Sequence, residues 1–127
     1  MLLLDTSALL WVLVDSPRLG RASRARIAAA SRVHASAVSV VELVVKGMLG
    51  RIELPPDLPD AIRAQSVVEL PLGFDDAAAI RDFPELVGHD PFDRMLVAQA
   101  HAQGLTLLTS DRVLLGLDRH FILDATR

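Results

Sequence analysis

Residues 2–7, Leu2-Leu3-Leu4-Asp5-Thr6-Ser7, form an apolar run followed at once by three residues of the helix N-cap type. A second stretch repeats this arrangement, because the apolar run at residues 105–109 leads into Ser110-Asp111. Apolar runs without polar alternation are typical of strands that are buried on both faces of a parallel sheet. Both stretches therefore predict a buried strand that leads into a helix.

Helical and strand patterns alternate through the rest of the chain. Gly50 and Gly104 stand where helices should end, and Asp90-Pro91 stands where a helix should begin. We expect helices over 8–14, 18–31, 39–48, 60–66, 75–82 and 91–103, with strands over 2–4, 33–36, 67–72 and 105–109 and an edge strand near 121–123. This alternation predicts the α/β class, with a mainly parallel sheet and helices on both faces.

Length and composition favour one compact domain over residues 1–127. Of the 127 residues, 51% are hydrophobic and 23% are charged, which suits a folded core rather than a disordered chain. The chain contains no cysteine, so disulfides and thiolate metal sites are excluded and a reducing compartment is expected. We find neither a signal peptide nor an apolar run approaching the ~20 residues of a membrane span, and we expect a cytoplasmic protein.

The charge balance argues at first against nucleic-acid binding. The formal net charge is −3, whereas nucleic-acid-binding proteins usually carry a basic surface. A metal site changes this balance. If four of the 16 acids held cations, 12 acids would face 13 lysines and arginines.

Four acids stand at positions from which they could converge. Asp5 and Asp111 follow apolar strands, and ligands of open α/β sheets bind beyond the carboxyl ends of the strands. Glu42 lies within an apolar run, where a carboxylate is costly to bury unless it is paired or bound to a metal. Asp93 lies one turn into the helix that Asp90-Pro91 opens.

Each of these acids also has a purely structural explanation. Asp5 and Asp111 fit as caps of the helices that follow them, and the cap is the preferred interpretation for Asp90. Glu42 stands four residues before Lys46, a spacing that allows an ion pair on one helix face. The joint placement of the acids, rather than any one of them, indicates a site.

Carboxylates in such a cluster suit hard divalent cations, which take oxygen ligands. Two such ions can activate a water and stabilise the leaving oxygen of a phosphodiester. The sequence offers no other hydrolytic centre, since it has no G-x-S-x-G, H-E-x-x-H or phosphate-binding glycine motif. Its four histidines show no spacing typical of metal ligands.

The acidic segments resemble, in order, the motifs of PIN-domain ribonucleases, and the resemblance covers essentially the whole chain. The first is Leu3-Leu4-Asp5-Thr6-Ser7-Ala8-Leu9-Leu10-Trp11, and the second runs from residue 36 to 45 around Glu42. The third is His89-Asp90-Pro91-Phe92-Asp93-Arg94-Met95-Leu96-Val97-Ala98-Gln99-Ala100. It is the most specific and is similar to that of the VapC toxins. Leu107-Leu108-Thr109-Ser110-Asp111 resembles the fourth.

The resemblance implies a three-layer α/β/α fold and a toxin of a type II toxin–antitoxin pair. Such a toxin is an endoribonuclease that hydrolyses tRNA or ribosomal RNA with a metal-activated water, commonly as a homodimer, and a VapB antitoxin silences it. The implied metal is Mg²⁺, with Mn²⁺ as a substitute, held by Asp5, Glu42, Asp93 and Asp111.

Supporting residues are also implied. Hydroxyls next to the acids could orient carboxylates or water, and they belong to Thr6, Ser7, Thr109 and Ser110. Asp90 and Arg94 lie within the third motif with roles left open; Arg94 could hold a phosphate or pair with an acid.

Three alternatives stay open at this point. One is a PIN-domain nuclease with a housekeeping role in RNA processing. Another is a phosphoacceptor module of the receiver type, although such a module would have paired acids after its first strand and a lysine after its last core strand. The last is a non-catalytic binding module in which the acids are only helix caps.

Overall fold

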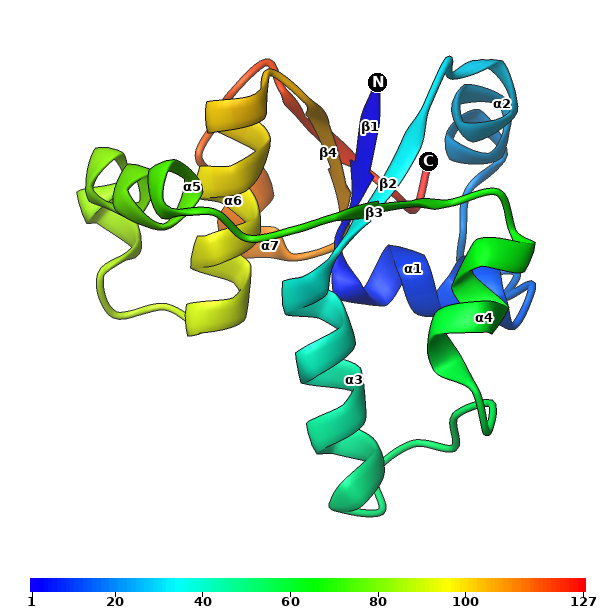
Figure 1. The fold of residues 1–127 in the computed structure, drawn as a ribbon. Coiled ribbons are helices and arrows are strands. Elements are labelled where there is room, and N and C mark those ends of the chain that lie inside the picture. Colours follow the sequence, from blue (N-terminus) through cyan, green and yellow to red (C-terminus); the bar gives the residue numbers. More distant parts are fainter.

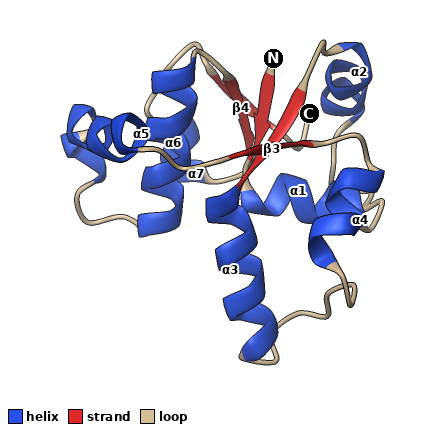
Figure 2. Ribbon diagram, viewed as in Figure 1, coloured by secondary structure: helices blue, strands red, loops and turns tan.

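The computed structural model describes residues 1–127 and contains a five-stranded sheet in which every neighbouring pair of strands is parallel. The strand order is β3-β2-β1-β4-β5, so the first strand lies at the centre (Figures 1 and 2). The strands are β1 (Leu2–Leu4), β2 (Val33–Ser36), β3 (Val68–Leu70), β4 (Thr106–Thr109) and β5 (Ile122–Asp124). The predicted α/β fold with a central parallel sheet is therefore confirmed.

The apolar run of β1 is continuous because both faces of the sheet are covered. Leu2 and Leu4 belong to one buried cluster, and Leu3, which points the other way, belongs to a second cluster. Leu107 and Leu108 of β4 divide between the two clusters in the same way. All five side chains are nearly inaccessible to solvent, so the sheet forms the middle of three layers.

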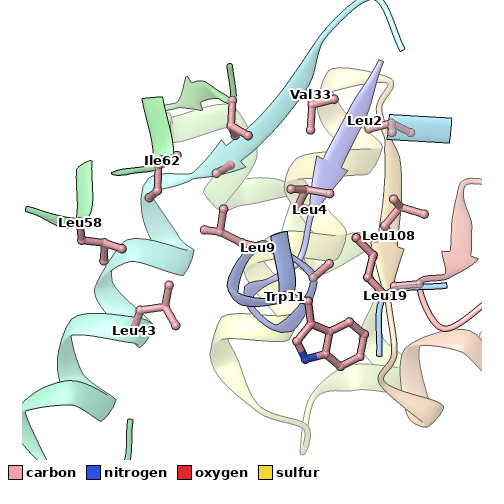
Figure 3. Packing of buried hydrophobic residues seen from close by; sticks show 14 residues of the cluster. Leu2, Leu4, Leu9, Trp11, Leu19, Val33, Leu43, Leu58, Ile62 and Leu108 are labelled. Carbon is pink, nitrogen blue, oxygen red and sulfur yellow. The ribbon is translucent and has the colours of Figure 1, made fainter. Parts of the chain in front are cut away.

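The first cluster packs one face of the sheet against α1 (Thr6–Leu13) and α4 (Leu58–Ala64), with α2 (Arg21–Ala29) at its edge. Figure 3 shows Leu4, Leu9 and Trp11 among its members, with Ile62 of α4 near β2. Helix α1 begins at Thr6 because the Asp5 carboxylate accepts a hydrogen bond from the Ala8 amide. The central strand therefore leads directly into a helix of the first layer.

The second cluster packs the opposite face of the sheet against α6 (Pro91–Gln103) and α7 (Arg112–Leu115). Beside α6 lie α5 (Phe74–Ala78) and the short helices η1 (Ala79–Asp82) and η2 (Pro84–Leu86). Leu96, Val97 and Ala100 are the fully buried positions of α6 in this cluster. Helix α3 (Ala37–Met48) contributes to both layers, since Val38 belongs to the second cluster and Leu43 to the first.

Several boundaries differ from the sequence-based expectation, each for a local reason. Helix α3 begins two residues before Ser39, because Ser36 accepts a hydrogen bond from the Val38 amide and caps it. Helix α4 begins at Leu58 because the Asp57 carboxylate accepts one from the Asp60 amide. The η2 turn was not expected at all. None of the helices has the length and apolar content needed to cross a membrane.

The end of the chain docks against the start of α2. The Gly20 amide donates to the Ala125 carbonyl and the Ser23 amide donates to the Arg127 carbonyl, each over 2.9 Å. Gly20 permits this approach because a Cβ at that position would lie 2.0 Å from the Arg127 carbonyl oxygen. The segment that follows β5 is thereby fixed to the first helical layer.

Candidate active site

A pocket lined only by polar residues lies beyond the carboxyl ends of β1 and β4. Figure 1 shows α1 beginning at the end of β1 on this side of the sheet. The volume of the pocket is about 230 Å³. The lining residues come from four distant segments and are Asp5, Thr6, Ser7, Glu42, Lys46, Asp90, Asp93, Ser110 and Asp111. The structure therefore brings the four sequence-predicted acids together at one edge of the sheet.

Asp5 is the most deeply buried of these acids, with 3% of its surface exposed. Its Oδ1 accepts a hydrogen bond from the Ala8 amide over 2.8 Å, and its Oδ2 accepts one from the Thr109 hydroxyl over 2.6 Å. The pKa of Asp5 is raised to about 6. Burial is the main cause, the two hydrogen bonds oppose it, and the charges of Glu42 and Asp111 add to it. The carboxylate is held rigidly but lacks a compensating positive charge.

Glu42 and Lys46 line the pocket from α3, and the fully buried Ser39 lies one turn before Glu42. Spacings of three and four residues place the three side chains on one helix face, and Ser39 accepts a hydrogen bond from the Thr6 hydroxyl over 3.0 Å. The Lys46 ammonium lies 2.7 Å from Glu42 Oε2. Glu42 Oε1 is buried without any hydrogen-bond partner, which is costly for a carboxylate oxygen unless a cation binds it.

Asp90 and Asp93 stand at the start of α6 but differ in their surroundings. Asp90 Oδ1 caps the helix, accepting from the amides of Phe92 and Asp93 over 2.8 and 3.2 Å. Asp93 Oδ2 lies 3.1 Å from Nε2 of His89. The pKa of Asp93 is raised to about 7, first by burial and then by the charges of Asp111, Asp90, Asp5 and Glu42.

Asp111 completes the cluster at the start of α7. Its Oδ1 accepts from the Leu114 amide over 3.0 Å and caps the helix, while its Oδ2 lies 3.5 Å from His89 Nε2. His89, Asp93 and Asp111 each offer a ligand atom, and these three atoms all lie within 4.8 Å of one another. His89 thus stands between two of the acids.

These features fit a divalent cation. The pocket offers several carboxylate oxygens, which are the ligands that hard cations prefer. Two of its acids have raised pKa values because their negative charges are crowded and poorly hydrated, and one buried oxygen of Glu42 has no partner. A bound dication would stabilise the charged form of all of these groups at once.

The residues that cap helices also lie at the pocket. Asp5, Asp90 and Asp111 cap helices and also line the pocket. Glu42 pairs with Lys46, as its spacing allowed, and still faces the pocket. A cap occupies one carboxylate oxygen and leaves the other available, so a capping role does not exclude a role in the pocket.

The supporting residues divide into three groups. Thr6, Ser7 and Ser110 line the pocket with the acids. Thr109 is fully buried behind it, where its hydroxyl donates to Asp5 and accepts from the Asp111 amide. Arg94 does not line the pocket; its Nη1 donates to the Val87 carbonyl over 3.2 Å, and it forms no ion pair with an acid.

Two residues of the site were not predicted as members. The spacing of the four histidines predicts no metal ligand, yet His89 contacts Asp93 and Asp111. Lys46 was considered only as a partner of Glu42, yet it lines the pocket. The spacing of four residues in His89–Asp93 and in Glu42–Lys46 was the available signal in both cases.

The sequence profile of the PIN domain matches residues 2–119. The chain therefore belongs to the PIN-domain family, a class of nucleases. No curated protein sequence matches the chain.

Solved structures that resemble the fold include several toxin–antitoxin proteins. DNA-bound VapBC from Salmonella typhimurium is 20% identical with a TM-score of 0.68, and a toxin–antitoxin complex from Klebsiella pneumoniae is 18% identical with a TM-score of 0.66. VapBC-1 from nontypeable Haemophilus influenzae is 17% identical with a TM-score of 0.67. Each comparison covers 98% of both chains, and at these identities the likeness establishes the shared fold.

Proposed function

We propose that this chain is a Mg²⁺-dependent endoribonuclease, with Mn²⁺ as a substitute, that acts as the toxin of a VapBC-type pair. The observation that carries the proposal is the convergence of Asp5, Glu42, Asp93 and Asp111 in one polar pocket. Membership of the PIN-domain family supports nuclease activity, and the toxin–antitoxin complexes of the same fold support the toxin role. We propose that residues 1–127 form a single nuclease domain and that this domain acts in the cytoplasm.

The four acids would hold the metal, and the residues around them fix the positions of the acids. When bound, the cation supplies Lewis-acid activation of water and neutralises charge at the phosphodiester. Thr109 fixes Asp5 by a hydrogen bond and Asp111 through its backbone amide. The bond from Thr6 to Ser39 ties α1 to α3 and keeps Glu42 opposite Asp5.

The charges of the pocket give the metal a role in RNA binding as well as in cleavage. Five acids and only one cationic residue line the pocket, so the metal-free pocket repels phosphate. A chelator should therefore weaken RNA binding at this pocket as well as stop cleavage.

A protein partner is part of the proposal. A metal-free pocket of this charge attracts arginine or lysine side chains, so we propose that a VapB-type antitoxin places such a side chain there. Exposed apolar residues at the far end of α3, including Val45, Met48 and Leu49, support a protein-binding surface for the antitoxin or for a second copy in a homodimer. A complex structure with only solvent in the pocket would contradict the inhibition mechanism.

Growth of bacteria that express the chain tests the toxin role. Expression alone should arrest growth, Asp93→Asn should abolish the arrest, and co-expression of the cognate antitoxin should restore growth. Asp82→Asn is the matched control, since Asp82 is an exposed acid outside the pocket. Unchanged growth with a folded protein that still cleaves RNA would favour a housekeeping nuclease.

Titration with Mn²⁺ separates the proposal from the binding-module alternative. Acids that only cap helices should not bind one ion in common, whereas the pocket should bind Mn²⁺ and lose most of its affinity in Asp93→Asn. Wild-type protein that binds no Mn²⁺ would contradict the metal site itself.

A further inference from the structure

Lys46 is the only lysine of the chain. It is also the only cationic residue that lines the polar pocket of Asp5, Glu42, Asp93 and Asp111, here called the acid pocket. It stands in the last turn of α3, with 41% of its side chain exposed. Glu42 fixes its ammonium through the contact of 2.7 Å with Oε2. The charge is thus held at the pocket while part of the side chain faces solvent.

The Lys46 ammonium has more N–H donors than the protein supplies acceptors for. A lysine side chain carries three N–H donors, and the single protein acceptor of Lys46 is Glu42 Oε2. Two donors therefore have no acceptor in the protein. Because Glu42 restricts the side chain, a ligand that accepted these donors would cost little additional side-chain entropy.

Lys46 is the only basic side chain among the residues that line the pocket. The remaining lining residues are acids or hydroxyls. Arg94, the arginine of the third acidic motif, is turned toward the Val87 carbonyl instead. A phosphate that approaches the site past Lys46 would find a fixed positive charge with two free donors.

We propose that Lys46 binds a phosphate of the RNA at the mouth of the acid pocket, with its ammonium positioned by Glu42. This role rests on the proposed nuclease function and adds to it a substrate-binding residue that is distinct from the metal ligands. The contact is electrostatic, so it should affect RNA affinity equally for different sequences.

Binding of a fluorescent single-stranded RNA of 20 mixed nucleotides tests the proposal. Anisotropy is measured at several salt concentrations in Ca²⁺ instead of Mg²⁺, and a denaturing gel confirms that the RNA stays intact. Loss of one phosphate contact should reduce the slope of log K against log salt by ~0.7, which corresponds to about fivefold weaker binding at 0.1 M salt. We expect both changes in Lys46→Met.

Two further variants make the result specific. Lys46→Arg keeps the charge and should retain the wild-type slope. Arg51→Met removes the same charge from an exposed position outside the pocket and should also leave the slope unchanged. Lys46→Met should bind Mn²⁺ at least as tightly as wild type, because it removes a cation next to Glu42.

Each remaining outcome overturns the proposal in a recognisable way. An unchanged salt slope in Lys46→Met, with intact metal-dependent cleavage by the wild type, would refute only the role of Lys46. Loss of Mn²⁺ affinity along with RNA affinity would show that Lys46 acts solely through Glu42. Wild-type protein that binds neither Mn²⁺ nor RNA would refute the proposed nuclease function and this role together.

Discussion

The Thr109 hydroxyl donates a hydrogen bond of 2.6 Å to Asp5 Oδ2 and thereby joins the ends of the two central strands, β4 and β1. The same hydroxyl oxygen accepts from the Asp111 amide over 3.0 Å. Thr109 is completely buried, so this one side chain sets the relative position of two acids from opposite ends of the sequence. The arrangement makes Thr109 a positioning residue for the proposed metal site.

Replacing Thr109 with valine should weaken metal binding without changing the shape of the core. Valine lacks the donor that lowers the pKa of Asp5, so that pKa should rise further above about 6. Mn²⁺ affinity measured by calorimetry should fall more at pH 6 than at pH 8.5, and the free energy of unfolding should decrease by about 1–3 kcal/mol. Thr109→Ser, which retains the hydroxyl, is the control. Equal Mn²⁺ affinity in Thr109→Val and wild type at both pH values would be inconsistent with this role.

Metal binding should release protons at slightly acidic pH. The pKa of Asp93 is raised to about 7 and that of Asp5 to about 6, so at pH 6.5 a large fraction of Asp93 carries a proton that a cation must displace. Affinity should therefore fall as the pH decreases below about 7. Calorimetric titration in two buffers with different ionisation enthalpies measures the release. Heats that do not depend on the buffer at pH 6.5 would argue against the raised pKa values.

Cleavage should leave a 5′-phosphate and a 3′-hydroxyl on the products. Hydrolysis by an activated water breaks the bond to the 3′ oxygen, and no side chain is needed to deprotonate the 2′-hydroxyl of the RNA. Ligation of the upstream fragments, which carry the new 3′ end, to an adaptor that requires a 3′-hydroxyl, without prior phosphatase treatment, checks this. Products with 2′,3′-cyclic phosphates would contradict the proposed mechanism.

A test of the fold uses Gly20, which lies against the end of the chain. Gly20→Ala should lower the free energy of unfolding by about 1–3 kcal/mol, because the new methyl group must displace the backbone of the docked segment. The control is Gly88→Ala, since a Cβ at Gly88 would meet no atom within 4 Å. Thermal unfolding of the two variants compares them. Similar melting temperatures for both would show that the docked segment contributes little.

The middle of the sheet was predictable because β1 and β4 are short, largely apolar and bounded by residues with defined local preferences. Asp5 after β1 and Asp111 after β4 mark strand ends by their capping chemistry, and parallel strands bring such ends to one edge. The boundaries of α3 and α4 were less predictable, because caps by Ser36 and Asp57 extend both helices beyond the apolar pattern.

The detailed contacts of the pocket were not predictable from spacing. His89 meets Asp111 only because the loop before α6 lies beside the start of α7, and that proximity is a property of the folded chain. Arg94 stands one residue after Asp93, yet successive helical positions point in different directions, and its guanidinium bonds the Val87 carbonyl. A sequence motif thus locates the acids but not the partners of each side chain.

Incubation of the purified, antitoxin-free protein with total bacterial RNA is the decisive test of the proposed nuclease activity. The reactions contain Mg²⁺, Mn²⁺ or excess chelator, with Asp93→Asn and Asp82→Asn proteins in parallel. We expect discrete cuts in Mg²⁺ and Mn²⁺ that persist in Asp82→Asn and disappear with chelator and in Asp93→Asn. Cuts that survive chelation or the loss of Asp93, or folded wild-type protein that leaves every RNA intact, would contradict the proposed metal-dependent nuclease activity.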